Sequence, residues 1–194
     1  MNKPDLLQRR RWSSIYANRL VFAIQTCSGY RACVADHMGK EYFFISDIDD
    51  VSIGRALLDC LASSRWVVPT RRNDVLQPED IEFDPDLFDR KQVVERYQSW
   101  VGRLIEFTGC KSKAKLFKPM YYASIEEVDG LLIIHPWYQE KSEAWSGSGM
   151  QDVENVIVPA GSSPDEIGKA VRLALSRCLS KFQSLDTYQT PITE

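Results

Sequence analysis

The sequence predicts an α/β protein of the α+β type, made of two similar halves that each hold mostly antiparallel strands and a helix. A weak internal repeat is the main reason. Residues 14–24 align with residues 124–134 at an offset of 110, and residues 43–57 align with residues 157–171 at an offset of 114. In both copies, short apolar runs precede a stripe of apolar residues with helical spacing. The two matches occur in the same order, which indicates a duplicated unit of strands followed by a helix.

The first half reads as three strands and a helix. Residues 19–27 form a short apolar run typical of a buried strand, and residues 30–35 and 41–45 predict two more strands separated by a turn. A helix is expected to begin near Asp49 or Asp50, because the apolar positions that follow recur at i, i+3, i+4, i+7 and i+8. We therefore expect this helix to bury one face.

The second half repeats this order. Residues 131–135 and 153–158 predict strands, and a helix follows them. Ser163 can cap that helix, Pro164 stands at its first position and Glu166 at its third. This combination satisfies free backbone donors and suits the helix dipole. The helix of the second half is therefore the more clearly marked of the two.

A loop and a central helix are expected to join the halves. Residues 69–85 are rich in Asp, Glu and Pro, which is typical of a loop or linker. Asp84 can cap a helix and Pro85 can occupy its first turn, so we expect the central helix from about Asp86. Lysines at every second position over residues 111–115 would line one face of an exposed strand and protect a sheet edge.

The composition predicts a single globular domain over residues 1–194, with pseudo-repeats at about 14–65 and 124–182. Of the 194 residues, 44% are hydrophobic and 26% are charged, as in ordinary globular chains. No apolar run approaches the length of a membrane span, and the N-terminus does not read as a signal peptide. The five cysteines are odd in number and scattered, so we expect a reduced, cytoplasmic protein.

The sequence holds no familiar catalytic or cofactor motif. It lacks the HExxH, CxxC, P-loop, GxGxxG and GxSxG patterns, so we expect no cofactor and no metal site. His37 reads as a solvated turn residue and His135 as a hydrogen-bonded residue at a strand end. A small hydrolase stays open as an alternative, using either the loop acids Asp47, Asp49 and Asp50 or a Cys-His pair that meets in space.

Acidic residues are concentrated in one segment. Residues 74–89 contain several Asp and Glu but no Lys or Arg, although the net charge of the chain is only −3. Such a segment repels phosphate and attracts cationic partners, which argues against direct nucleic-acid binding. It reads either as a solvated connector or as a docking surface for a basic protein. Trp145, beside a flexible glycine run, is a further candidate contact because Trp often dominates interface energies.

Three segments resemble the immunity proteins of bacterial contact-dependent growth inhibition systems. They are residues 108–117, the strand at 131–135, and residues 156–170, which include the capped helix start. The resemblance spans most of the chain, from about Ser14 to Phe182. It implies a cytoplasmic protein that binds and blocks the C-terminal toxin domain delivered by a sibling cell. Such toxins are frequently nucleases.

We therefore expect a non-enzymatic inhibitor that forms a 1:1 complex with a basic toxin domain, without a nucleic-acid or membrane partner. A nuclease needs a cationic cleft to hold phosphate, so an acidic inhibitor can cover that cleft. No binding position carries over from the family, and the predicted toxin-binding residues come from charge and side-chain type alone. They are Asp47, Asp49, Asp50, Asp74, Glu79, Asp80, Glu82, Asp84, Asp86 and Trp145. A homo-oligomeric scaffold with self-pairing strands is the remaining alternative.

Overall fold

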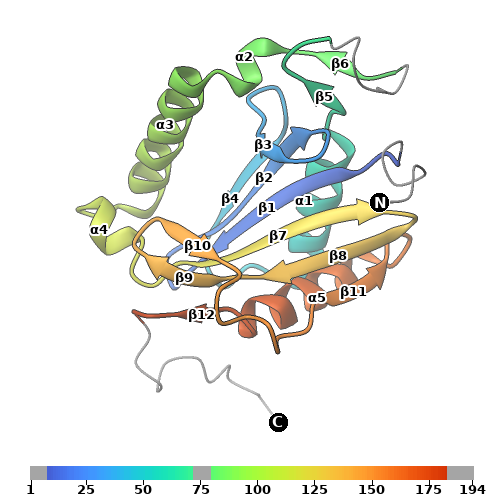
Figure 1. The fold of residues 1–194 in the computed structure, drawn as a ribbon. Helices are drawn as coiled ribbons and strands as arrows, with labels where there is room; N and C mark the ends of the chain where they lie inside the picture. Colours follow the sequence, from blue (N-terminus) through green and yellow to red (C-terminus); the bar gives the residue numbers. More distant parts are fainter. Residues whose placement is uncertain (1–7, 72–79, 183–194) are drawn as a thin grey trace.

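One large antiparallel sheet organises the molecule. The computed structural model describes residues 8–71 and 80–182. Seven strands form the sheet in the order β11-β8-β7-β1-β2-β3, with β4 also pairing with β2 (Figure 1). Their bounds are Arg11–Ala17 for β1, Phe22–Gly29 for β2, Cys33–Ala35 for β3, Glu41–Phe44 for β4, Tyr121–Val128 for β7, Leu131–Pro136 for β8 and Val156–Pro159 for β11.

Two equivalent hairpins lie side by side in this sheet. Strands β1 and β2 form the first hairpin, β7 and β8 form the second, and β1 pairs with β7 between them. In that central pairing Ser14 stands directly opposite Ser124, the residue 110 positions later. The mixed architecture of two similar halves, predicted from the sequence, is therefore present in the structure.

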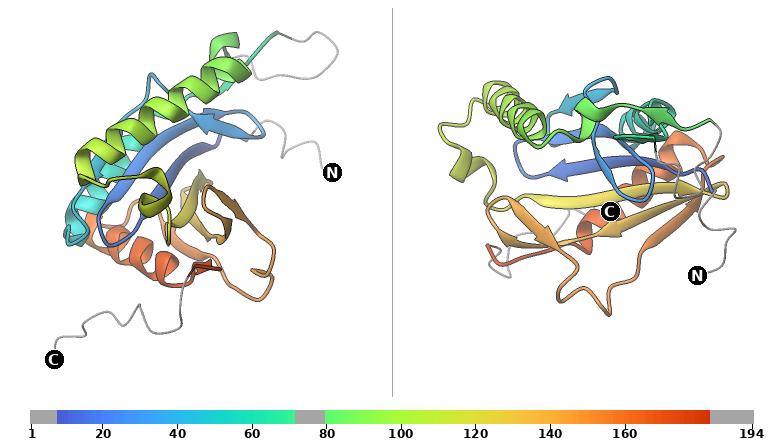
Figure 2. Two further views of the ribbon diagram at one scale, coloured as in Figure 1. Left: turned by 90° about the vertical axis from the view of Figure 1, so that its left-hand side faces the viewer. Right: turned by 45° about the horizontal axis from the view of Figure 1, so that its top comes forward.

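Two helices cover one face of the sheet, called the inner face below. Helix α1 (Asp50–Ala62) follows β4, and helix α5 (Pro164–Ser176) follows β11 (Figure 2). Where the two helices cross, their backbones approach so closely that no side chain would fit at the contact. A Cβ atom added at Gly54 would lie 1.9 Å from the carbonyl oxygen of Pro164, and one added at Gly168 would lie 2.0 Å from that of Asp50. The same glycine in each half thus makes the helix contact.

A third helix, α3 (Arg90–Thr108), covers part of the opposite, outer face. The short helix α2 (Pro85–Phe88) precedes it and the short helix α4 (Lys113–Leu116) follows it (Figure 1). Trp100, Val101 and Leu104 of α3 pack with Val21 and Ala23 of the first hairpin in a second hydrophobic cluster. Helix α3 therefore lies over the first half of the sheet.

Short strands complete the described part of the chain. Strand β5 (Val67–Val68) pairs in parallel with β6 (Glu82–Phe83). Strand β9 (Tyr138–Lys141) pairs with β10 (Ala144–Ser146) and with β12 (Leu179–Ser180). Among the described helices, none combines the length and the apolar character needed to cross a membrane.

The lysine-rich segment differs from the sequence prediction. Residues 113–116 form helix α4 rather than an exposed strand, because the hydroxyl of Ser112 accepts a hydrogen bond from the backbone N–H of Lys115 and caps the turn. Leu116 and Phe117 are fully buried against α3. Burial of this apolar pair fixes the local structure, and the lysine spacing does not.

The connection between the halves also differs in detail. Asp84 caps a helix as predicted, but that helix ends after one turn and Asp89 caps α3 separately. The segment predicted as a loop, residues 69–85, contains β6. Strand β1 was not predicted, because Ser13 and Ser14 interrupt its apolar pattern. Both serines are buried, and the hydroxyl of Ser13 donates to the carbonyl of Gln25 in the neighbouring strand.

Candidate binding cleft

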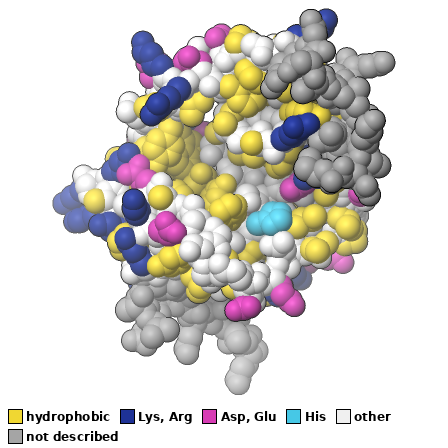
Figure 3. Space-filling view, viewed as in Figure 1, with side chains coloured by type: hydrophobic (Ala, Val, Ile, Leu, Met, Phe, Trp, Pro, Cys, Tyr) yellow, Lys and Arg dark blue, Asp and Glu magenta, His cyan; other side chains and the backbone are white. Residues whose placement is uncertain are grey.

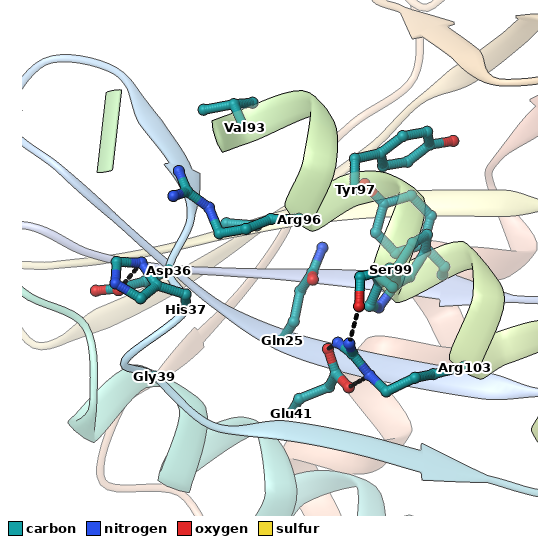
Figure 4. A pocket seen from close by; sticks show the side chains of 13 residues that line it. Gln25, Asp36, His37, Gly39, Glu41, Val93, Arg96, Tyr97, Ser99 and Arg103 are labelled. Carbon is teal, nitrogen blue, oxygen red and sulfur yellow. Dashed lines mark hydrogen bonds and ion pairs between the residues drawn. The ribbon is translucent and has the colours of Figure 1, made fainter. Parts of the chain in front are cut away.

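A cavity of about 450 Å³ lies between α3 and the outer face of the first half of the sheet. Its floor includes Tyr16 from β1 and Gln25 from β2, and Gln25 points into it (Figure 4). The turn between β3 and β4 forms one wall, and α3 forms the other. A concave site of this size, lined by aromatic side chains and a few polar groups, has the usual form of a binding site.

Asp36 fixes the turn that forms the first wall. Its side chain is fully buried and accepts hydrogen bonds from Arg65 at 2.7 and 3.0 Å and from the backbone N–H of Met38 at 2.9 Å. Burial would raise the pKa of Asp36, but these hydrogen bonds outweigh it, and the pKa lies below the ordinary value of an aspartate. The carboxylate therefore stays ionised and holds the turn in place.

Arg65 links this wall to the acidic segment. Its guanidinium also donates to Asp84 at 2.8 Å and to Glu82 at 3.3 Å. Hydrogen bonds to Asp36 and Asp84 raise the pKa of Arg65. One half-buried arginine thus gathers three carboxylates from two separate parts of the chain.

Two arginines of α3 are held in place on the second wall. Arg103 donates to both carboxylate oxygens of Glu41, at 3.1 and 2.8 Å, and to the hydroxyl of Ser99 at 2.9 Å (Figure 4). Arg96 donates to the backbone carbonyls of Asp86 at 3.1 Å and Leu87 at 2.6 Å. Hydrogen bonds therefore hold both arginines in position, Arg103 through a carboxylate and Arg96 through two backbone carbonyls.

The back of the cleft is aromatic. The ring of Trp100 lies 4.8 Å from that of Tyr16 and 5.9 Å from that of Tyr97, measured between centroids. Trp100 is only 4% exposed, and among the described residues its indole N–H has no hydrogen-bond partner. A buried donor without a partner carries a free-energy cost that a ligand can relieve.

Three of the predicted acidic contacts lie beside this cleft, although none of them lines it. We call Glu82, Asp84 and Asp86 the acidic rim. Glu82 and Asp84 are joined to the cleft wall through Arg65, and Asp86 through its backbone contact with Arg96. Glu82 and Asp86 are exposed, whereas Asp84 is mostly buried because it caps α2. The rim gives this end of the cleft a negative charge.

The other predicted acids do not join the rim. Asp80 lies 3.7 Å from Arg9, and Asp74 and Glu79 lie outside the described residues. Asp47, Asp49 and Asp50 precede or begin α1, which covers the inner face. Asp49 caps that helix through the backbone N–H of Ser52, and Asp50 accepts a hydrogen bond from Arg172 of α5. These two acids have structural roles, and toxin contact by Asp47, Asp49 and Asp50 stays a prediction.

Trp145 belongs to the aromatic packing behind the cleft. Its ring lies 5.3 Å from Tyr16 and 5.4 Å from Tyr122, and its indole N–H donates to the carbonyl of Met120 at 2.8 Å. The residue is half-buried. Its immediate role is therefore to support Tyr16, and a direct toxin contact by Trp145 stays a prediction.

Sequence reasoning missed most of the cleft lining. Asp36, Arg65 and Arg96 are about thirty residues apart from one another and belong to no motif. Only the fold brings them together, through the turn after β3, the segment after α1 and the first half of α3. Within residues 8–71 and 80–182, no three His, Cys, Asp or Glu side chains converge as metal ligands.

Comparisons with known proteins agree with this fold. A family model described as "CDI immunity protein" matches residues 11–178. A curated protein of Yersinia pseudotuberculosis serotype O:3 (strain YPIII), named Immunity protein CdiI-YPIII, is 39% identical over 167 residues, which are 86% of this chain and 94% of that protein.

Two solved structures are also similar. A chain from the "CdiA-CT/CdiI toxin and immunity complex from Yersinia pseudotuberculosis" matches with a TM-score of 0.84 and 38% identity, over 88% of this chain and 98% of the other. A protein of unknown function from Neisseria meningitidis matches with a TM-score of 0.74 and 34% identity, over 88% of this chain and 96% of the other.

Proposed function

Because the chain belongs to the CDI immunity protein family, we propose that it binds and neutralises the cognate toxin domain of a contact-dependent growth inhibition effector. The toxin is proposed to be a basic nuclease bound as a 1:1 complex in the cytoplasm. A relative of this chain was solved in a toxin and immunity complex, which supports a toxin domain as the partner. Neutralisation by binding needs affinity and steric exclusion, with no cofactor and no reaction.

The cleft with its acidic rim is the observation that carries the proposed binding site. Paired charges hold its walls rigid, so little order is lost when a partner enters. The aromatic back offers Tyr16, Tyr97 and Trp100 as apolar contacts, the residue types that usually dominate interfaces. Glu82 and Asp86 stand exposed beside the cleft and attract a cationic partner.

Co-expression with the toxin domain encoded immediately upstream tests this function. We expect the two chains to co-purify as a 1:1 complex and the cells to resume growth. We also expect association of the purified proteins to slow as salt is added, because the rim attracts the toxin through charge. A toxin that kills cells despite co-expression, with no complex recovered, would overturn the proposal.

No second function is proposed. The hydrolase alternative used either the loop acids or a Cys-His pair, and of the loop acids Asp49 and Asp50 are engaged as a helix cap and as an acceptor for Arg172. His37 lies beside Asp36, with 3.9 Å between its Nδ1 and the carboxylate oxygen. The homo-oligomeric scaffold stays an untested alternative.

A further inference from the structure

The two halves of the sheet differ in what covers their outer faces. In the first half, Val21 is 0% exposed and Ala23 is 1% exposed beneath α3. The equivalent positions of the second half are Leu131 and Ile133, and Leu131 is 40% exposed. No helix in the described ranges lies over this second half of the outer face (Figure 1).

The neighbouring strands show the same contrast. Ala23 of β2 pairs directly with Phe43 of β4, and Ile133 of β8 pairs directly with Ile157 of β11, so the register of the two halves is identical. The ring of Phe43 lies 5.8 Å from that of Phe107 of α3, whereas Ile157 is 58% exposed. The second half therefore repeats the apolar positions of the first but lacks their cover.

The covered half shows which element fits such a surface. It is an amphipathic helix that presents Val101 and Leu104, three residues apart, to Val21 and Ala23. Leu131, Ile133 and Ile157, which we call the β8–β11 platform, form the matching row of apolar side chains. Hydrophobic side chains are visible on this face, over β8, in Figure 3.

Charges at the edges of the platform indicate which charge a helix that docks there should carry. Asp129 stands in the turn at one end, Glu154 precedes β11 at the other end, and both are exposed. Glu126, directly opposite Ile133 in the sheet, is paired with Arg10 at 2.7 Å. A helix that carries Lys or Arg beside its apolar residues complements this arrangement.

We infer that the β8–β11 platform binds an amphipathic helix of the cognate toxin, with aliphatic residues spaced three or four apart and basic residues beside them. The inference rests on the proposed function and adds a second contact surface, separate from the cleft. The platform lies at the opposite end of the sheet from the strands under α3, with β7 and β1 between. A toxin that contacts both surfaces is therefore held at two separate places.

The double variant Leu131→Asp/Ile157→Asp tests the platform. Both side chains are exposed, so the charges interrupt docking with little effect on the core. We expect the dissociation constant for the purified toxin domain to rise at least about 30-fold. The matched control is Leu173→Asp, a 47% exposed leucine on α5 in the inner layer, and it should leave the dissociation constant unchanged.

The outcomes separate the inference from the proposed function. If the wild-type chain binds the toxin and the double variant binds equally well, the platform is not a toxin contact and the proposed function stands. If the wild-type chain does not bind the toxin, both fail. If the pure chain is a dimer that the double variant converts to a monomer, the platform is a contact between copies and the inference is overturned.

A photo-crosslinking residue at position 157 tests the helical character of the occupant. Crosslinks to toxin residues three or four apart are expected, because a helix presents that spacing to one surface. Crosslinks to alternate residues would show an extended strand instead and would overturn the helix.

Discussion

At the scale of single residues, Arg65 has the largest expected effect on the cleft. Its side chain is 17% exposed, and it donates to the fully buried carboxylate of Asp36 as well as to Asp84. Asp36 in turn holds the backbone of the β3–β4 turn. The shape of the cleft wall thus depends on a single ion pair that no local sequence pattern reveals.

Replacing Arg65 by Ala should destabilise the chain by roughly 3 kcal/mol, because Asp36 is left as a buried charge without its partner. Urea unfolding of wild type and Arg65→Ala measures this difference. Arg55→Ala, which removes an exposed arginine of α1, is the matched control and should change the free energy of unfolding by less than about 0.5 kcal/mol. Equal losses in the two variants would contradict a special role for Arg65.

The pKa of Asp36 predicts a dependence of stability on pH. Its folded pKa lies below the ordinary value, so the ionised carboxylate stabilises the fold fully above the unfolded pKa of about 3.9, and this contribution is lost as the pH falls through the folded pKa. We expect the difference in unfolding free energy between wild type and Asp36→Asn to be largest near pH 7 and to shrink below pH 4. A difference that stays constant down to pH 2.5 would contradict the lowered pKa.

At the scale of elements, the contact between α1 and α5 sets the inner layer. Gly54 and Gly168 let each helix backbone reach the first turn of the other. Both glycines occur at the same place in the repeated pattern, Ile53-Gly54 and Ile167-Gly168. The close helix crossing is therefore made by equivalent glycines of the duplicated sequence.

Gly54→Ala should destabilise the chain by about 1–3 kcal/mol or more, because the new methyl group meets backbone atoms that cannot move aside. The control is Gly102→Ala on α3, where an added Cβ has nothing within 4 Å. That substitution should stabilise the chain by about 0.5–1 kcal/mol through better helix propensity. Thermal unfolding of both variants measures these changes in stability. Stabilisation by both substitutions would contradict the tight helix crossing.

Elements with a local signal were predictable, and those without one were not. Helix α5 has the expected capping box, with Ser163 and Glu166 bonded to each other's backbone N–H groups. Strand β1 was missed because its buried serines are satisfied by neighbouring strands, which the sequence does not show. The cleft was missed for the same kind of reason, since Asp36, Arg65 and Arg96 meet only after the sheet and α3 have packed.

At the scale of the whole molecule, acids precede α3 and lysines follow it. The acidic rim comes just before the N-terminal end of α3, and Lys111, Lys113 and Lys115 follow its C-terminal end. Lys and Arg side chains gather around that C-terminal end, at the left of Figure 3. Summed fields of this kind orient a charged partner before contact and accelerate association. A basic toxin would therefore approach the rim side of the cleft first.

Removing two rim charges together, Glu82→Gln and Asp86→Asn, should slow association with the toxin about tenfold at low salt and leave dissociation nearly unchanged. Stopped-flow measurements at several salt concentrations give both rates. Glu106→Gln, near the far end of α3, is the control for a simple change in net charge. Association that is equally fast for the double variant and insensitive to salt would contradict steering by the rim.

Calorimetric titration with the toxin domain encoded beside this chain tests most directly whether the cleft is the toxin-binding site. The wild-type chain should bind one toxin domain tightly, and Gln25→Trp, which fills the cleft from its floor, should weaken binding at least about 30-fold. Ile45→Trp, at a position 63% exposed and outside the cleft, should bind like wild type. No complex with the wild-type chain, or equal affinity for the Gln25→Trp chain, would contradict toxin binding in the cleft.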